Sequence, residues 1–332
     1  MTRVFRVLVA SRDTALPEKV RQALAALPAS LGVAELELQS LDISQVTGSE
    51  PLNAASLDLL AEARIFLSEP RVAPRLLPHA PKLEWLQSIY AGIEPLLAQP
   101  RRDFIVTRAG GIMGLHMAQY VLGWVISKER MFHLAPQYQA KKEFRNAELH
   151  YRHYDNVTVG ILGLGDIGLE IGNLINRAGF QVVGLKRSGL TESRERFSVT
   201  SDLKTVLSTS DYVVNVLPST PQTRNLLSGN VLQACQAKQP CFINVGRGDV
   251  VDEASLVHAL DEKWLSSAVL DVFAVEPLPV ESALWEHPQV TITPHVAALS
   301  MAEDVAAIFA RNASHFLAKT EMEYKLEWDR GY

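Results

Sequence analysis

The sequence predicts an α/β protein of two domains, each built on a doubly wound parallel sheet. Apolar runs of strand length alternate with helical segments over most of the 332 residues, and this order is typical of parallel sheets whose crossover connections are helices. A chain of this length is long enough for two hydrophobic cores. A mostly apolar segment from Ile112 to about Phe132, long enough for one crossing helix, separates the two series of strands.

The first series of elements lies before Gly110 and Gly111, which we interpret as a hinge. A helix is expected from about Pro17 to Leu27, because Pro is favoured in the first turn of a helix. A second helix is expected around residues 53–63. Residues 33–39 alternate between apolar and polar side chains, as in a half-exposed strand. The strands expected in this part of the chain are residues 5–10, 33–39, 64–67, 83–87 and 104–107.

The second series begins at Val157, and two of its helices have good N-cap residues, Asp202 and Asp252. A last helix over roughly residues 300–318 returns to the first domain, because the chain has no other segment left to form a third. We therefore assign residues 1–109 and 298–332 to one discontinuous domain and residues 110–297 to the other. The strands expected in the second domain are residues 157–162, 181–185, 212–217, 241–245, 267–270 and 290–293.

A glycine-rich turn, Gly-Leu-Gly-Asp-Ile-Gly at residues 163–168, stands between the first strand and the first helix of the second domain. Strand, turn, helix and strand in this order are the context that a dinucleotide-binding fingerprint requires. We expect Gly163 to form the tight turn, Gly165 to approach a pyrophosphate and Gly168 to allow helix–strand contact. The pyrophosphate would lie at the helix N-terminus, where free N–H groups favour an anion. The alternative is an ordinary glycine-rich turn of an α/β sheet.

Three polar residues, Arg247, Glu276 and His295, each follow a later strand of the second domain. Open α/β sheets bind ligands at the carboxyl ends of their strands. Hydride transfer to a 2-oxo acid needs an Arg for the carboxylate and a His that donates a proton to the carbonyl oxygen. A carboxylate beside the His favours its protonated form and raises its pKa. Taken singly, each residue has a structural alternative, namely a surface arginine, a loop carboxylate or a structural histidine; together with the fingerprint they predict an active site.

The sequence resembles the D-isomer-specific 2-hydroxyacid dehydrogenase family, particularly its glyoxylate/hydroxypyruvate reductase branch. The order and spacing of the matching stretches agree with the family over essentially the whole chain. The resemblance implies a flavodoxin-like substrate domain and a Rossmann cofactor domain, in which Arg247 binds the substrate carboxylate, Glu276 supports His295 and His295 exchanges the proton. The matching stretches are GLGDIG at 163–168, LPSTPQT at 217–223, NVGRGDVVDE at 244–253, LDVFAVEP at 270–277 and PHVA at 294–297.

The same resemblance implies further cofactor and substrate contacts. It places the backbone of Asp166 and Ile167 at the pyrophosphate and Asp271 at the nicotinamide carboxamide. It also implies that a substrate-domain loop, whose backbone N–H groups hold the substrate carboxylate, corresponds to Tyr90, Ala91 and Gly92; an ordinary strand-to-helix turn is the alternative. The remaining residues implied at the cofactor are Leu217, Pro218, Thr223, Val245 and Gly246.

The end of the second strand of the cofactor domain departs from the pattern of many relatives, which carry an acidic residue there for the ribose hydroxyls. This chain has Lys186, Arg187 and Ser188 instead. A carboxylate would repel a 2′-phosphate, whereas Lys, Arg and Ser can bind one. We therefore predict that NADP(H) is preferred and that NAD(H) is possible; a solvated basic turn is the alternative.

Composition limits the partners of the chain. The net charge of −5, with 47% hydrophobic and 21% charged residues, gives no reason to expect nucleic acid or an anionic membrane as a partner. The only cysteines, Cys235 and Cys241, stand in no metal-ligand pattern, so we expect two buried thiols, a reducing compartment and no metal. No apolar run is long enough to span a bilayer, and the N-terminal segment reads as a strand rather than a signal peptide. We expect a cytoplasmic protein.

These features predict an NADPH-dependent reductase of small 2-oxo acids, with glyoxylate and hydroxypyruvate as leading substrates by resemblance and a D-2-hydroxy acid as product. One alternative is a dehydrogenase of a larger or phosphorylated 2-hydroxy acid. Another is a binding protein that senses NAD(P), similar to the corepressors of the family. Homodimers are usual among the relatives, and the helix that begins near Ile112 is the expected interface.

Overall fold

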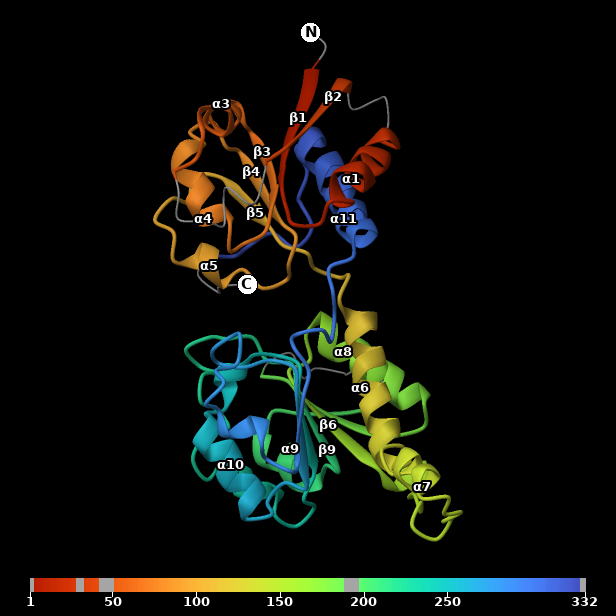
Figure 1. The fold of residues 1–332 in the computed structure, drawn as a ribbon. Coiled ribbons are helices and arrows are strands. Elements are labelled where there is room, and N and C mark those ends of the chain that lie inside the picture. Colours follow the sequence, from red (N-terminus) through yellow and green to blue (C-terminus); the bar gives the residue numbers. More distant parts are fainter. Residues whose placement is uncertain (1–2, 28–32, 42–50, 188–196, 329–332) are drawn as a thin grey trace. The chain divides into compact units, whose positions relative to one another are not determined.

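The computed structural model describes residues 3–27, 33–41, 51–187 and 197–328 of the chain. The chain forms two compact units (Figure 1). Unit 1 comprises Met1–Met113 and Ser300–Tyr332, and unit 2 comprises Gly114–Leu299. The chain therefore enters unit 2 once, returns to unit 1 once, and leaves unit 1 discontinuous in sequence.

Unit 1 contains a five-stranded parallel sheet in the order β2-β1-β3-β4-β5. All five strands expected in this part of the chain are present. They are β1 (Arg3–Ala10), β2 (Val33–Ser40), β3 (Ile65–Ser68), β4 (Trp85–Ser88) and β5 (Ile105–Thr107). The helical segments among the described residues of the unit are α1 (Leu16–Ala25), α3 (Ala54–Glu62), α4 (Ala73–Leu76), η2 (Leu77–His79), α5 (Glu94–Leu97) and α11 (Ala302–Ala318).

Both faces of this sheet are buried. Along β1, Val7 and Val9 pack into one apolar cluster, whereas Leu8 and Ala10 pack into a second one. Successive side chains of a strand point to opposite faces, so an uninterrupted apolar strand requires a cover on both sides. The helices of unit 1 supply these two covers.

The C-terminal helix α11 packs in unit 1 against α1 and the sheet. Phe309 of α11 stacks on Trp85 of β4 with ring centroids 4.8 Å apart. The buried Asn312 donates to Gln87 Oε1 at 3.0 Å, and Thr107 donates to the same oxygen at 2.7 Å. An apolar stack and a satisfied polar network thus hold the end of the chain against the sheet formed by its beginning.

Unit 2 contains a seven-stranded parallel sheet in the order β12-β11-β10-β9-β6-β7-β8. Six of these strands are those predicted. The seventh, β8 (Ser198–Thr200), was not expected; it has three residues, and β7 is its one partner among the described strands. The predicted strands are β6 (Thr158–Leu162), β7 (Gln181–Leu185), β9 (Tyr212–Asn215), β10 (Cys241–Asn244), β11 (Ser267–Leu270) and β12 (Val290–Ile292).

The predicted N-caps of unit 2 are confirmed. The Asp202 side chain accepts hydrogen bonds from the first turn of α9, and the Asp252 side chain accepts one from Ser255 N in α10. These bonds satisfy N–H groups that have no partner inside the helix. The helical segments of unit 2 are α6 (Gly114–Glu129), α7 (Ala135–Ala140), η3 (Tyr154–Asn156), α8 (Asp166–Arg177), α9 (Leu203–Thr209), η4 (Val231–Cys235), η5 (Gly248–Val250), α10 (Glu253–Asp261) and η6 (Ala283–Trp285).

Helix α6 is the long apolar helix that we interpreted as crossing between domains. It belongs as a whole to unit 2 and runs beside α8 (Figure 1). Its buried residues, Ala118, Val121 and Val125, pack in the same apolar cluster as Ile171 and Ile175 of α8. The apolar composition of α6 therefore reflects packing against a neighbouring helix of its own unit. None of the described helices is long and apolar enough to cross a bilayer.

Candidate active site

The glycine-rich turn between β6 and α8 has the form that a dinucleotide needs. Gly163 has φ of +104°, which favours glycine. A Cβ at Gly168 would lie 1.9 Å from the Gly163 carbonyl oxygen, so the expected close contact of helix and turn is present. A Cβ at Gly165 would meet no atom within 4 Å, which leaves the space before the helix open.

The N-terminus of α8 lies at this open space. Gly165 is its N-cap residue, and no described side chain accepts a hydrogen bond from the N–H groups of the first turn. Asp166 is exposed and Ile167 half-buried. Uncapped N–H groups and the positive end of the helix dipole favour an anion at this point. The turn and the helix therefore fit the pyrophosphate of a dinucleotide.

Lys186 and Arg187 lie directly after β7, the strand next to β6. The Lys186 backbone N–H donates to Thr200 O of β8 at 2.9 Å. The Lys186 side chain is half-buried and that of Arg187 is exposed. Both cations follow the carboxyl end of a strand on the edge of the sheet that carries the glycine turn. Ser188, the third residue predicted here, lies outside the described residues.

Two buried asparagines, Asn215 and Asn244, brace the loops that follow β9 and β10, and sequence reasoning gave them no role. Asn215 Nδ2 donates to Asn244 Oδ1 at 2.8 Å, and Leu217 N donates to Asn215 Oδ1 at 3.2 Å. Gly246 N donates to Asn244 Oδ1, and Asn244 Nδ2 donates to Arg247 O, both at 3.2 Å. The pair therefore holds Leu217, Gly246 and Arg247 at one edge of the sheet. A polar residue at the end of an apolar strand was the signal that could have revealed them.

Hydrogen bonds within the segment of residues 217–223, which includes three of the residues implied at the cofactor, hold its backbone. Thr223 Oγ1 donates to Pro218 O at 2.5 Å and accepts from Thr220 N at 2.8 Å. Val245, in the loop that follows β10, is 1% exposed, and its N–H donates to Asn215 O. These contacts give the predicted cofactor residues fixed backbone positions.

The loops that carry Arg247 and Glu276 pack closely against each other. A Cβ at Gly248 would lie 2.0 Å from the carbonyl carbon of Phe273, so the two backbones touch at this point. Phe273 N donates to Glu276 Oε1 at 3.0 Å. Arg247 is half-buried, and its Nη1 donates to Gly246 O at 2.8 Å. The loop that carries Arg247 therefore lies against the loop that carries Glu276.

His295 and Glu276 form a hydrogen-bonded pair. His295 Nδ1 lies 2.9 Å from Glu276 Oε2. The His295 side chain is 50% exposed and the Glu276 side chain 21% exposed. A carboxylate on Nδ1 holds the ring in one orientation and leaves Nε2 as the nitrogen that can exchange a proton with a ligand.

Asp271, which is 1% exposed, holds the backbone beside His295. Its carboxylate accepts from Val296 N and Ala297 N at 2.9 Å and from Thr293 Oγ1 at 2.5 Å. His295 has φ of +56°, which is uncommon for a non-glycine residue, and its N–H donates to Asp271 O at 2.9 Å. Asp271 thus positions the histidine loop, a role that the sequence did not indicate.

Helix α6 extends this network. The Tyr120 hydroxyl lies 2.6 Å from Thr293 Oγ1. Because Thr293 donates its proton to Asp271, the Tyr120 hydroxyl is the donor to Thr293. Burial raises the pKa of Tyr120, so the phenol keeps its proton at neutral pH. Tyr120 and Thr293 were not predicted as site residues.

Tyr90, Ala91 and Gly92 follow β4 in unit 1, whereas the other predicted site residues belong to unit 2. Ser88 Oγ accepts from Tyr90 N at 3.1 Å and donates to Tyr90 O at 2.8 Å. Ala91 and Gly92 are half-exposed, and Tyr90 is 39% exposed. Ser88 therefore holds the start of the loop, and Ala91 and Gly92 are small enough for a ligand to approach their backbone closely.

A parallel sheet with a dinucleotide turn at one edge, and a His–Glu pair and an arginine at the same edge, defines an NAD(P)-dependent oxidoreductase. Residues 122–297 match the family model described as D-isomer specific 2-hydroxyacid dehydrogenase, NAD binding domain. The chain belongs to the D-isomer specific 2-hydroxyacid dehydrogenase family. It is therefore an enzyme that acts on a 2-hydroxy or 2-oxo acid with a nicotinamide cofactor.

Individual relatives agree with this assignment. The chain is 31% identical over 247 residues to a glyoxylate/hydroxypyruvate reductase A of Serratia proteamaculans, covering 71% of this chain and 78% of the relative. A D-isomer specific 2-hydroxyacid dehydrogenase family protein of Aeromonas salmonicida has a similar crystal structure, with a TM-score of 0.84, 35% identity, and coverage of 98% of this chain and 99% of that one. An NADPH-dependent glyoxylate/hydroxypyruvate reductase of Sinorhizobium meliloti, in complex with NADP and sulfate, gives a TM-score of 0.81 at 28% identity over 99% of this chain and 100% of that one.

Proposed function

We propose that this enzyme reduces a small 2-oxo acid, such as glyoxylate or hydroxypyruvate, to the D-2-hydroxy acid with NADPH. The hydrogen-bonded pair of His295 and Glu276 carries the proposal. It supplies a proton donor whose ring is oriented by a carboxylate, at the edge of the sheet where the family binds its cofactor. The Serratia and Sinorhizobium relatives are named glyoxylate/hydroxypyruvate reductases, which supports glyoxylate and hydroxypyruvate as substrates.

Each catalytic residue has one task. The Arg247 guanidinium binds the substrate carboxylate, for which its planar donors suit better than an ammonium group. His295 Nε2 donates a proton to the carbonyl oxygen as negative charge develops there. Glu276 holds the ring through Nδ1 and balances the positive charge of the protonated imidazole.

The cofactor is held by residues of unit 2. The uncapped first turn of α8 and the open space at Gly165 receive the pyrophosphate. Lys186 and Arg187 bind the 2′-phosphate of NADP, where a carboxylate would instead select NAD. The bound nicotinamide supplies the hydride. A structural neighbour from Xanthobacter autotrophicus, 29% identical, is in complex with NADPH, which supports this choice.

A panel of 2-oxo acids, assayed in parallel with NADPH and NADH, tests substrate and cofactor together. We expect turnover of glyoxylate and hydroxypyruvate with a higher kcat/KM for NADPH. His295→Ala and Arg247→Ala should lose nearly all turnover while still binding NADPH, and His287→Ala is a control because that histidine lies in unit 2 away from these loops. Wild-type turnover by either active-site variant would contradict the assigned roles.

We also propose that the enzyme is a homodimer, with α6 and the segment after it as the interface. Leu115 on α6 and Phe132 just beyond it are 55% and 54% exposed, and Phe144 is fully exposed. Large exposed apolar patches mark association surfaces, and these three side chains are the candidates for such a patch here. Sedimentation equilibrium should give twice the mass of one chain, and a Leu115→Glu, Phe132→Glu variant should sediment as a monomer.

A further inference from the structure

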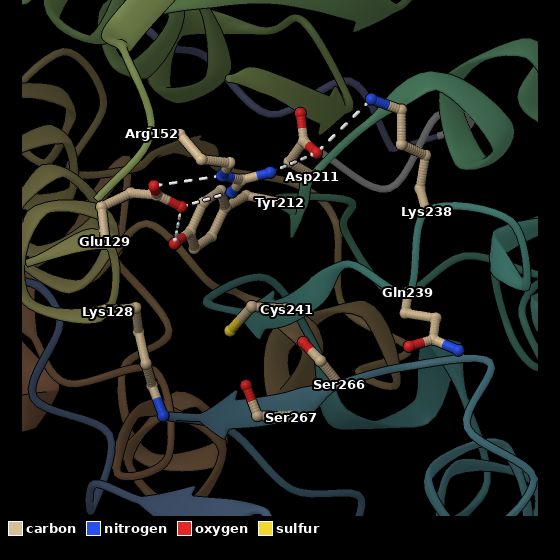
Figure 2. A pocket seen from close by; sticks show the side chains of 10 residues that line it. All are labelled: Lys128, Glu129, Arg152, Asp211, Tyr212, Lys238, Gln239, Cys241, Ser266 and Ser267. Atoms are coloured by element: carbon tan, nitrogen blue, oxygen red, sulfur yellow. Dashed lines mark hydrogen bonds and ion pairs between the residues drawn. The ribbon is translucent and has the colours of Figure 1, made fainter. Parts of the chain in front are cut away.

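A cavity of about 250 Å³ lies in unit 2, and Figure 2 shows the side chains that line it. Tyr212, Cys241 and Ser267, the first residues of β9, β10 and β11, line it. Because these strands are parallel, their first residues lie at one edge and the loops of Arg247 and Asp271 follow at the other. The cavity is therefore separate from the proposed catalytic site.

One side of the cavity carries charges that neutralise each other (Figure 2). Arg152 pairs with Glu129 and, through Nη1, with Asp211 at 2.6 Å. Lys238 lies 3.5 Å from Asp211 Oδ1, and the Tyr212 hydroxyl donates to Glu129 Oε1 at 2.7 Å. The two carboxylates are only 10% and 5% exposed. Two anions and two cations are thus paired, and this group adds no net charge to the cavity.

The other side of the cavity carries a cation that no described carboxylate neutralises. Lys128 lines it together with Ser266 and Ser267, and Figure 2 shows Lys128 and Ser267 across from the ion-paired group. Lys128 is half-buried and has no anionic partner among the residues that the structure describes. An ammonium group at the cavity that has no carboxylate partner can donate charge-assisted hydrogen bonds to an anion.

The neighbouring groups do not supply that negative charge. Burial raises the pKa of the Cys241 thiol, although a hydrogen bond with Ser267 and the charge of Lys128 act in the opposite direction. Burial and the Glu129 carboxylate raise the pKa of the Tyr212 phenol. Both groups are neutral at neutral pH.

The C-terminus of α6, which carries Lys128, does not neutralise the site either. The carbonyls of Ile126, Ser127 and Lys128 accept hydrogen bonds from the N–H groups of Arg130, Phe132 and Met131, at 2.9, 3.0 and 3.2 Å. These carbonyls are hydrogen-bonded within the chain and carry no formal charge, so they favour the Lys128 cation without neutralising it. The charged side chains that line the cavity therefore sum to one positive charge, although the net charge of the chain is −5.

We propose that this cavity is a second ligand site, which binds a small oxyanion through Lys128 Nζ and the hydroxyl groups of Ser266 and Ser267. The volume lies below the range of about 300–1,000 Å³ that is usual for sites of drug-sized ligands. The ligand is therefore a phosphate or a short dicarboxylate, both of which accept charge-assisted hydrogen bonds from an ammonium group and from hydroxyl groups.

The test is calorimetric titration of the full chain with inorganic phosphate and, separately, with succinate. The protein carries Arg247→Gln, which removes the main anion-binding side chain of the proposed active site, and is saturated with NADPH, which occupies the phosphate positions of the cofactor. Chloride at equal ionic strength serves as the reference. In this background we compare Lys128→Met and Ser267→Ala with Lys204→Met, an exposed lysine on α9 of the same unit.

Saturable binding of at least one probe is expected, and the probe that binds identifies the ligand as phosphate or carboxylate. Lys128→Met should weaken binding about tenfold or more, and Ser267→Ala by a similar factor, because each removes a charge-assisted hydrogen bond. Lys204→Met should leave the affinity unchanged. The proposal is overturned if neither probe binds, or if binding is unaffected by both Lys128→Met and Ser267→Ala. None of these readouts depends on turnover, so they remain separate from the tests of the proposed function.

Discussion

Replacing Thr293 by valine is expected to loosen the loop that carries His295. The Thr293 hydroxyl donates to Asp271 Oδ1 at 2.5 Å and lies 2.6 Å from the Tyr120 hydroxyl. Valine has nearly the same shape but no hydroxyl group. The buried Asp271 carboxylate then loses one of its three donors, and the half-buried Tyr120 hydroxyl loses its acceptor.

The magnitude follows from the charge and burial of Asp271. A hydrogen bond to a charged group contributes about 1.5–3 kcal/mol, and leaving a buried partner unsatisfied adds a desolvation cost. The valine side chain would also bury one more methyl group, which offsets a part of that loss. We expect the native arrangement of residues 295–297 to lose about 2 kcal/mol relative to its opened state, which corresponds to roughly 30-fold more frequent opening.

Amide hydrogen exchange measures this opening directly. The N–H groups of Val296 and Ala297 both donate to the Asp271 carboxylate at 2.9 Å, so both should exchange faster in Thr293→Val. The kcat should fall, because the ring of His295 loses its fixed position, while the dissociation constant for NADPH should change little. Thr291→Val is the matched control: Thr291 lies in β12, the strand that directly precedes Thr293, and its hydroxyl has no hydrogen bond with another described residue.

Unchanged exchange of these two amides in Thr293→Val would refute the reasoning, because the hydroxyl would then not hold the loop. Equal acceleration in Thr291→Val would refute it as well, since the effect would then belong to the strand and not to the hydrogen bond. A lower kcat with unchanged exchange would indicate a direct role of Thr293 in the reaction instead.

Three further predictions concern the proton donor, the cofactor and the buried thiols. Glu276→Gln keeps an acceptor for Phe273 N but removes the negative charge, so kcat for glyoxylate should fall about 100-fold with little change in KM; a kcat within twofold of wild type would contradict this. Arg187→Glu should raise KM for NADPH and lower it for NADH, and unchanged KM values would place the 2′-phosphate elsewhere. Burial raises the pKa of Cys235 from 9.0 to about 12, so the unfolded chain releases this proton first. The urea midpoint should therefore fall as pH rises above about 9, and should fall less in Cys235→Ala; identical pH profiles of the two proteins would argue against a buried thiol.

Most of the fold could be predicted because strands, glycine turns and N-caps are local features. The apolar strand before Gly163 and the caps at Asp202 and Asp252 each depend on neighbouring residues, and the structure confirms them. The strand Ser198–Thr200 escaped prediction, since three residues are too few to show an alternating pattern. The extent of the α6 helix was predicted approximately, but its apolar pattern does not say which neighbour it buries against.

The candidate site divides in the same way. Arg247, Glu276 and His295 stand in motifs that can be recognised along the chain, but the pairing of His295 with Glu276 is a contact between separate loops. The residues that support the site, such as Thr293, were not predicted because nothing in the sequence distinguishes them from other polar residues. Thr293 supports the histidine loop only because Asp271 lies beside it in the folded chain, and no local pattern predicts that contact.

By itself the sequence determined the class of fold, the dinucleotide turn and the basic end of β7, and it predicted the catalytic residues, because these depend on composition, periodicity and short motifs. Only the tertiary structure decided which side chains hold those residues in place: Asn215 with Asn244, and Tyr120 with Thr293 and Asp271. It also brought Lys128 and the ion-paired group of Glu129, Arg152, Asp211 and Lys238 to one cavity. Hydrogen bonds and charges between residues distant in sequence depend on distances of a few ångströms, and only the packing of the sheet and its helices determines those distances.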